Sequence, residues 1–283
     1  MTLLRWPMIL ALILADKVQP LIDARPPFLL PLHEETALER LVRVVLRGPF
    51  GGTIVAADAA FSADVKNALS GFVVQHVALP SAAQGTVGAL APALKFAEEF
   101  RARWERAMAA ANARFKDESD DDGDDNDDDT PAKNPKGPPR KSQPGHAHAP
   151  QDWGRHSKNA DVKIRGLARS FERDGVMLFR AERPLLRPEL QAQLVEAFAR
   201  ESADKRDQAR PFAQAVHQGV RAYPVLLSRA VIPEITALPP STLFDDWLLN
   251  QLKRIQDVQV EDAGVLESLS SAEDYERIKR ELE

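Results

Sequence analysis

Histidines are the first side chains in this sequence whose type suggests chemistry. Three of them are spaced closely enough to hold a transition-metal ion, but no carboxylate is placed to orient their rings: His146, His148 and His156. Solvated histidines are therefore the favoured interpretation of this trio. The other three accompany no recognisable serine or cysteine nucleophile motif: His33, His76 and His217. A hydrolase triad thus has no support.

An acidic tract is the second set of residues that could do chemistry. Ten carboxylates lie between Asp117 and Asp129. The tract lacks the ligand spacing and the glycine position of a calcium loop, so a solvated acidic spacer is favoured over a cation site. The formal net charge is -5, and the chain without this tract is mildly basic. That charge is too weak to indicate nucleic-acid binding.

Composition excludes several other classes of site. The chain contains no cysteine, which excludes a disulfide framework, a thiolate nucleophile and a cysteine zinc site, and makes a reducing cytoplasm the expected location. It also contains no P-loop and no G-x-G-x-x-G motif. With 283 residues, 44% of them hydrophobic, the chain can form one large α/β domain or two average domains.

The apolar pattern predicts the elements that must position any site. The run Met8–Leu14 predicts a buried strand, and a signal peptide is the less favoured alternative because no cleavage site precedes Asp16. The run is also shorter than the roughly 20 residues of a membrane span. Further strands are predicted at 52–57, 73–79, 175–180 and 223–228. Helices are predicted at 34–48, 64–69, 87–114, 162–171, 188–199, 233–237 and 243–255, and after Ser271. This alternation is typical of an α/β sheet with helices on both faces.

Residues 115–158 differ in composition from the rest of the chain. The acidic tract is followed by a stretch rich in Pro, Lys and Arg, which cannot bury enough apolar surface to offset its ordering entropy. We predict a disordered insertion that interrupts one domain, whose two parts are 1–114 and 159–283. The partner of such an insertion, expected to be a protein, is not specified by the sequence.

Six segments, in order along the chain, resemble those of the MobA-like nucleotidyltransferases, the molybdenum cofactor cytidylyl- and guanylyltransferase group. The run 9–15 is similar to the family's first strand, and 28–32 with 37–42 resembles its ALLPL...LLERV segment. The remaining segments resemble GMSSSLRAGL, the D-x-P turn with its flanking strand and helix, GHPVLFSR and GVLLDIDTPEDYER: 84–94, 176–190, 223–229 and 264–277. The resemblance covers most of the chain outside the insertion.

This resemblance implies a fold, a reaction and a set of site residues. The implied fold is a Rossmann-like, glycosyltransferase-A-type sheet, and the implied reaction transfers an NMP from an NTP to a small phosphorylated acceptor with Mg2+. Glu182 falls on the metal aspartate of D-x-P, with Pro184 keeping the turn. Leu14 and Ala15 match the family's nucleotide-binding loop, and Gly85 and Thr86 are base or ribose contacts by analogy with the family. Lys17 and Arg25 lie near enough in sequence to contact the phosphates in place of the missing lysine. No membrane partner and no specific nucleic acid are expected.

The chain departs from the family at the positions that carry the chemistry. The loop glycine is replaced by Asp16, whose carboxylate would repel a triphosphate, and the lysine before ALLPL falls on Pro27. The closing DID falls on Ser268–Ser270, which leaves Glu261, Asp262 and Glu267 as the nearby carboxylates, and Tyr223 replaces the histidine before PVLF. Two hypotheses follow: a nucleotidyltransferase with a degenerate site, or a catalytically inactive relative that serves as a binding or assembly module.

Overall fold

The computed structural model describes residues 8–16, 22, 25–80, 85–120, 174–204 and 210–283, with backbone only at 112–120 and 201–204. Lys17, the predicted helix 162–171 and most of the predicted insertion lie outside these residues. The chain divides into two units, residues 1–102 with 167–283 and residues 103–166. The sheet and the candidate site belong to the first unit.

A central parallel strand is the organising element of the sheet. Strand β1 (Ile9–Ala15) lies between β4 (Gly52–Asp58) and β6 (Gly175–Arg180) and runs parallel to both. All seven of its residues are buried, as expected for a continuous apolar run covered on both faces. The buried-strand interpretation of this run is confirmed.

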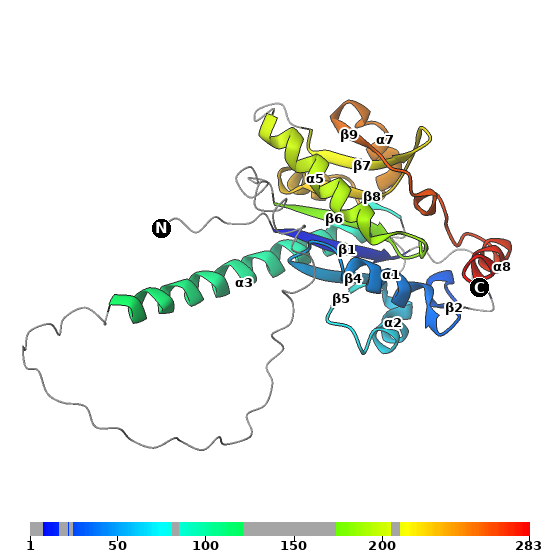
Figure 1. The fold of residues 1–283 in the computed structure, drawn as a ribbon, viewed down its shortest axis with the longest axis horizontal. Helices are drawn as coiled ribbons and strands as arrows, with labels where there is room; N and C mark the ends of the chain where they lie inside the picture. The colour runs from blue at the N-terminus through cyan, green and yellow to red at the C-terminus, as the bar shows by residue number, and fades with distance from the viewer. Residues whose placement is uncertain (1–7, 17–21, 23–24, 81–84, 121–173, 205–209) are drawn as a thin grey trace, which may run out of the picture. The chain divides into compact units, whose positions relative to one another are not determined.

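The complete sheet has seven strands in the order β5-β4-β1-β6-β8-β7-β9 (Figure 1). Strand β5 (Gln75–Leu79) is parallel to β4, β8 (Val220–Ser228) is antiparallel to both β6 and β7 (Phe212–His217), and β9 (Ile255–Gln259) is parallel to β7. Two short strands, β2 (Pro31–Leu32) and β3 (Glu35–Thr36), form a separate ribbon.

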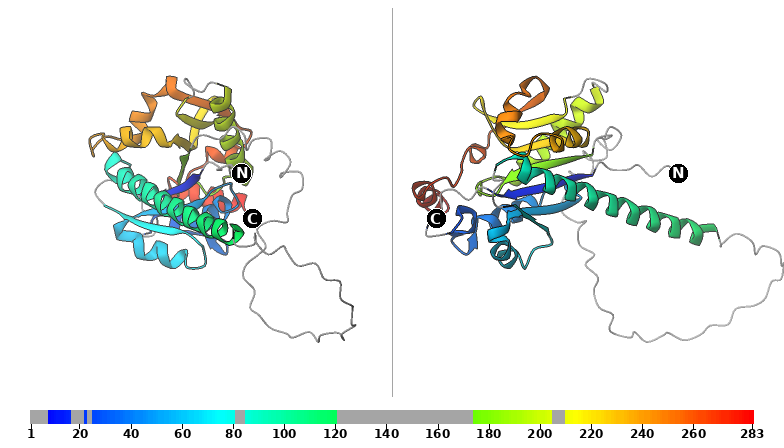
Figure 2. Two further views of the ribbon diagram at one scale, coloured as in Figure 1. Left: turned by 90° about the vertical axis from the view of Figure 1, so that its left-hand side faces the viewer. Right: turned by 180° about the vertical axis from the view of Figure 1, so that it is seen from behind.

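Helices cover both faces of the sheet because successive strand residues point to opposite sides. The core on one face joins odd-numbered residues of β1 and β6, such as Ile13 and Phe179, to α1 (Ala37–Val45), α2 (Ser62–Ala68) and α5 (Pro188–Asp204). On the other face lie α7 (Phe244–Leu249), whose Trp247 contacts Phe212, and the first part of α3 (Val87–Asp120). Figures 1 and 2 show these two faces from the front and from behind.

The remaining helical segments are short, except for the C-terminal helix α8. They are α6 (Ile232–Thr236), α8 (Ala272–Glu281) and the 3-10 turns η1 (Pro27–Leu29), η2 (Ala59–Phe61), η4 (Arg229–Val231), η5 (Leu252–Arg254) and η6 (Ala263–Val265). Within the described part of the chain, none of the helices combines the length and the apolar character needed to cross a membrane.

The expected fold class, an α/β sheet with helices on both faces, is confirmed, but the sequence did not predict two of the seven sheet strands or the short ribbon of β2 and β3. The sequence pattern predicts no element over β7. The predicted helix 243–255 is α7 followed by the turn η5, and β9 begins at Ile255. The missed β7–β8 hairpin turns at Gln218 and Gly219, whose φ angles of 49° and 83° are typical of a two-residue hairpin turn. Strand β7 was difficult to predict because its Ala and Gln residues have weak strand propensity. The predicted helix 87–114 is also longer than expected, since α3 continues to Asp120, six residues beyond Arg114.

Candidate functional site

The candidate site lies where β1 and β6 end. Leu14 is in register with Arg180, so the carboxyl ends of these parallel strands meet at one edge of the sheet, where ligands bind in open α/β sheets. Asp16 directly follows β1, and Arg180 is the last residue of β6. Both are buried, with 3% and 4% of their surface exposed. A carboxylate and a guanidinium are thus enclosed together at the edge of the sheet.

Asp16 uses both of its carboxylate oxygens within the protein. Its Oδ1 accepts a hydrogen bond of 3.0 Å from Nη1 of Arg180, and its Oδ2 accepts one of 3.0 Å from the backbone N–H of Gly85. Gly85 has a φ of 68°, a conformation that favours glycine, and it lies two residues before α3. The carboxylate therefore lies where a helix N-terminus offers N–H groups and a positive partial charge to an anion.

Arg180 also contacts two side chains on its other side. Its Nη2 lies 3.2 Å from Oδ2 of Asp245 and 3.4 Å from the hydroxyl of Tyr223, and its guanidinium carbon lies 4.9 Å from the centre of the Tyr223 ring. The Tyr223 hydroxyl donates a hydrogen bond to Oδ1 of Asp245. We call Asp16, Gly85, Arg180, Tyr223 and Asp245 the Arg180 network.

Burial and charge act in opposite directions on the ionisable groups of this network. Burial by itself would lower the pKa of Arg180, but Tyr223, Asp16, Asp245 and Glu182 together raise it above its ordinary value. Burial raises the pKa of Tyr223 above 10.0, opposed by Arg180 and reinforced by Asp245. The network therefore holds a charged guanidinium and a neutral phenol at neutral pH.

Glu182, the residue aligned with the family's metal aspartate, lies close to the Arg180 network and to the closing segment of the chain. It is 8% exposed, and its backbone carbonyl accepts a hydrogen bond of 2.8 Å from Leu269. The structure thus brings together the two regions that the resemblance pairs as metal-binding. Burial lowers the pKa of the neighbouring Arg183, and Glu182 opposes this shift.

Few carboxylates remain here to hold a divalent metal ion. Ser268 and Ser270 replace two carboxylates, and their hydroxyls lie 3.2 Å apart. Asp262 accepts from the backbone N–H groups of Gly264 and Arg187, and Glu267 forms an ion pair with Arg277. Among the described residues, no group of three or more His, Cys, Asp or Glu could hold a metal. Mg2+ in nucleotide sites is held by one or two carboxylates together with waters and substrate phosphates, and here Glu182 is the carboxylate that remains at a position aligned with the family's metal site.

Some of the other candidate positions lie beside the Arg180 network, and others lie apart from it. Leu14 and Ala15 are buried in β1, and Ala15 belongs to the core beneath α1 and α5. Thr86 directly precedes α3, and its carbonyl accepts from the first turn of that helix. Arg25 is exposed and forms an isolated backbone bridge with Ile22. Of the predicted binding positions, only Gly85 belongs to the Arg180 network, and Lys17 lies outside the described residues.

Sequence reasoning missed Arg180 and Asp245 as site residues. Arg180 ends a strand whose other residues are Gly, Val, Met, Leu and Phe, and an arginine at the end of a buried strand needs a buried partner. Asp16 follows the neighbouring strand in the same way, so the pair was detectable once β1 and β6 were paired. Asp245 is exposed in a short helix, and nothing in the sequence around it indicates a buried partner.

A cavity of about 220 Å3 adjoins the Arg180 network beside Tyr223 and Asp245.

Comparison with known proteins supports the fold. No protein-family model and no curated protein matches the sequence. Rv0371c of Mycobacterium tuberculosis has a similar structure, with a TM-score of 0.58 at 16% identity over 98% of this chain and 99% of that one. A nucleotidyl transferase of Methanothermobacter thermautotrophicus gives a TM-score of 0.55 at 15% identity over 97% of each chain.

Two further structures add to this comparison. A 4-diphosphocytidyl-2C-methyl-D-erythritol synthase of Anaerococcus prevotii has a TM-score of 0.55 at 11% identity over 98% of this chain and 96% of that one. Rv0371c has also been solved as a complex with manganese, with a TM-score of 0.53 to this chain at 16% identity over 96% and 98% of the two chains. At these identities the similarity shows a glycosyltransferase-A-like nucleotidyltransferase fold, and function depends on the site.

Proposed function

We propose that this chain is a catalytically inactive relative of the MobA-like nucleotidyltransferases that serves as a binding or assembly module. The observation that carries the proposal is the engagement of both Asp16 oxygens, one by Arg180 and one by the N–H of Gly85. In the resembling family a glycine stands at the position of Asp16. Here a carboxylate occupies an N–H group and a cation at the edge of the sheet where ligands bind in folds of this class.

Electrostatics explains why this arrangement opposes nucleotidyl transfer. The transferred group carries negative charge that cations and N–H groups must stabilise in the transition state. Asp16 is an internal anion at that place, so an incoming triphosphate would have to displace it from Arg180 and would meet a like charge. The segment that packs against Glu182 also carries serines where the family has two carboxylates, which leaves fewer protein ligands for Mg2+. The NTP, the phosphorylated acceptor and Mg2+ remain predictions of the active alternative, with Glu182 as the metal ligand.

The proposal is tested by thermal unfolding of the full chain with excess CTP, GTP or ATP, each with and without Mg2+, together with an assay for pyrophosphate release. A nucleotide at 100 times its Kd stabilises a folded protein by about 2.7 kcal/mol, which raises Tm by about 5 °C at this size. We expect no Mg2+-dependent shift and no pyrophosphate for the wild-type chain.

Two substitutions at Asp16 test whether its carboxylate is what keeps a nucleotide out of the site. Asp16→Gly restores the family residue and frees Nη1 of Arg180 and the N–H of Gly85, while Nη2 of Arg180 stays paired with Asp245. We therefore expect this variant to gain a nucleotide-dependent rise in Tm. Asp16→Asn keeps the size of the side chain and its capacity to accept from Gly85, and should gain less. A wild-type chain that releases pyrophosphate with Mg2+, and loses this activity in Glu182→Gln, would establish transfer and refute the proposal.

The proposal also includes a protein partner for the segment 115–158 and a cellular location. The segment 115–158 is the candidate arm for a protein partner, because its charged composition suits interaction better than packing. The absence of cysteine supports a reducing cytoplasm as the location. Affinity capture with the full chain and with a chain in which 115–158 is replaced tests the first expectation.

A further inference from the structure

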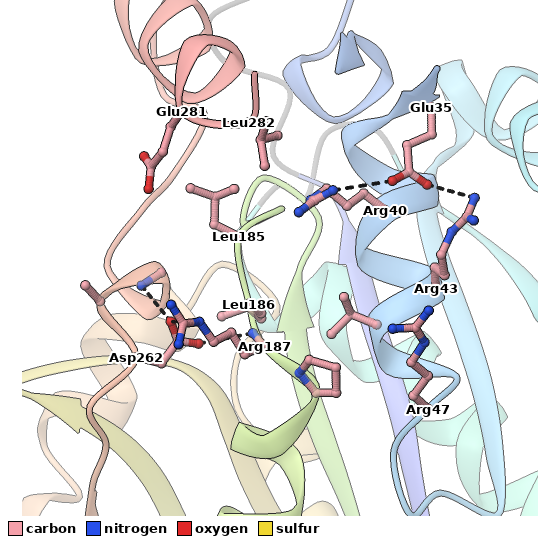
Figure 3. A pocket seen from close by; sticks show the side chains of 14 residues that line it. Glu35, Arg40, Arg43, Arg47, Leu185, Leu186, Arg187, Asp262, Glu281 and Leu282 are labelled. Atoms are coloured by element: carbon pink, nitrogen blue, oxygen red, sulfur yellow. Dashed lines mark hydrogen bonds and ion pairs between the residues drawn. The ribbon is translucent and has the colours of Figure 1, made fainter. Parts of the chain in front are cut away.

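A second polar cavity lies on the opposite face of the sheet from the Arg180 network. It has a volume of about 460 Å3, within the range of small-ligand pockets. Its walls come from α1, the loop between β6 and α5, η6 and the end of α8 (Figure 3). Four arginines line it: Arg40, Arg43, Arg47 and Arg187. We call it the arginine pocket.

Three of these arginines lie on one side of the pocket. Arg40 and Arg43 belong to α1, and Arg47 follows in the turn after it, so the spacing of three and four residues places all three along one helix face. Figure 3 shows Arg40 and Arg43 reaching toward Glu35, with Arg187 and Asp262 on the other side of the pocket. Like charges at this spacing destabilise a helix, and a bound anion would relieve that repulsion.

The carboxylates in the pocket neutralise these arginines incompletely. Glu35 lies 2.9 Å from Arg43 and 3.6 Å from Arg40, so one carboxylate serves two guanidinium groups. Arg47 is exposed and makes no side-chain hydrogen bond or ion pair with the residues that the structure describes.

Arg187 also has an exposed side chain with one long ion-pair contact. Its side chain is 75% exposed and lies 3.7 Å from Asp262, whose two oxygens already accept from backbone N–H groups of Gly264 and Arg187. Helix α5 begins at Pro188 beside this arginine and adds the positive end of its dipole. Arg47 and Arg187 therefore retain donors for a ligand on opposite sides of the pocket.

We propose that the arginine pocket binds a small molecule that carries a phosphate or diphosphate group. Guanidinium groups match phosphate oxygens with paired hydrogen bonds, and Arg47 and Arg187 supply these donors. The exposed Glu281 at the rim opposes anion binding and limits affinity. The sheet separates this pocket from the Arg180 network, so the inference does not depend on the proposed function.

The test is isothermal titration of the full-length chain with inorganic pyrophosphate and with inorganic phosphate, at an ionic strength fixed with sodium chloride. Removal of one charge-assisted contact weakens binding by about 10-fold. We expect this loss for Arg47→Gln and for Arg187→Gln. Glu281→Gln removes the opposing carboxylate and should tighten binding.

The matched control is Arg106→Gln, which makes the same charge change at an exposed position of α3. It should bind pyrophosphate like the wild type. All four substituted side chains are exposed, so Tm without ligand should not change. Absence of pyrophosphate binding at millimolar concentration, or equal weakening by Arg47→Gln and Arg106→Gln, would overturn the proposal. So would Arg47-dependent binding of an oligo-aspartate peptide without binding of pyrophosphate.

Discussion

At the scale of single residues, the fate of one carboxylate separates this chain from the family it resembles. A glycine at position 16 would leave Arg180 and the N–H of Gly85 open to a ligand, whereas Asp16 binds both. The change adds a charge that is 3% exposed, and such a charge persists only when it is paired. Asp16 and Arg180 therefore depend on each other for stability.

This dependence predicts a large effect of breaking the pair. Arg180→Met leaves Asp16 buried without its cation, which should lower the free energy of unfolding by about 3–5 kcal/mol. The exposed pair of Arg221 and Asp257, 2.7–2.8 Å apart, supplies the control, and Arg221→Met should cost less than about 1 kcal/mol. Urea unfolding measures both values.

A double variant checks the cause of that loss. In Asp16→Asn with Arg180→Met no charge remains buried at this position, so most of the lost stability should return. Equal stabilities for Arg180→Met and for the double variant would mean that packing, and not charge, explains the effect.

Tyr223 gives a prediction about pH. Its pKa is raised above 10.0 in the folded chain, mainly by burial, so the stabilisation linked to its proton is fully present below pH 10 and is lost as the pH rises further. We expect Tyr223→Phe to lose less stability than the wild type between pH 10 and pH 12. Thermal unfolding across this range measures it.

Spectroscopy gives an independent check on the same residue. The chain has two tyrosines, so the difference in tyrosinate absorbance between the wild type and Tyr223→Phe reports Tyr223 alone. This difference should appear only above pH 10 and together with unfolding. Ionisation of Tyr223 below pH 10 in the folded chain would contradict its burial.

At the scale of elements, local signals placed the helices and strands with regular patterns. Thr36 and Glu39 form a reciprocal capping box at the start of α1, which agrees with the helix predicted to open at this place. Strands β1 and β6 were found from their apolar runs. Strands β7 and β9 were missed, because Ala, Gln and Asp residues carry little strand propensity and only pairing with β8 and β7 makes them strands.

One buried residue of α3 joins the helix to the sheet. Arg101 is 0% exposed, and its Nη2 donates to the carbonyl of Gly175 at 2.7 Å, with the carbonyl of Met8 at 3.4 Å. It thus contacts the backbone where β1 and β6 begin. Arg101→Met should lower the free energy of unfolding by about 2 kcal/mol, measured by urea unfolding, whereas Arg106→Met at an exposed position should change little.

At the scale of the whole molecule, β1 pairs with β6 across more than 150 residues of sequence. The domain boundaries predicted from composition therefore imply that 115–158 contributes little to the stability of the sheet. Replacement of 115–158 by a Gly/Ser linker of the same length should leave Tm within about 2 °C of the full chain. A large fall in Tm, measured by calorimetry, would show that this segment is part of the folded domain.

The sequence by itself determined the central strand, the fold class and the loss of the family's glycine, lysine and closing carboxylates, because apolar periodicity and residue identity are local properties. The tertiary structure decided what replaced them. Arg180, Tyr223 and Asp245 come from β6, β8 and α7, and Asp16 meets them only because the carboxyl ends of β1 and β6 lie side by side. The arginine pocket depends on tertiary packing in the same way, since Arg47 and Arg187 are 140 residues apart in the chain. Spacing along the chain carries no information about contacts that the folding of the sheet creates.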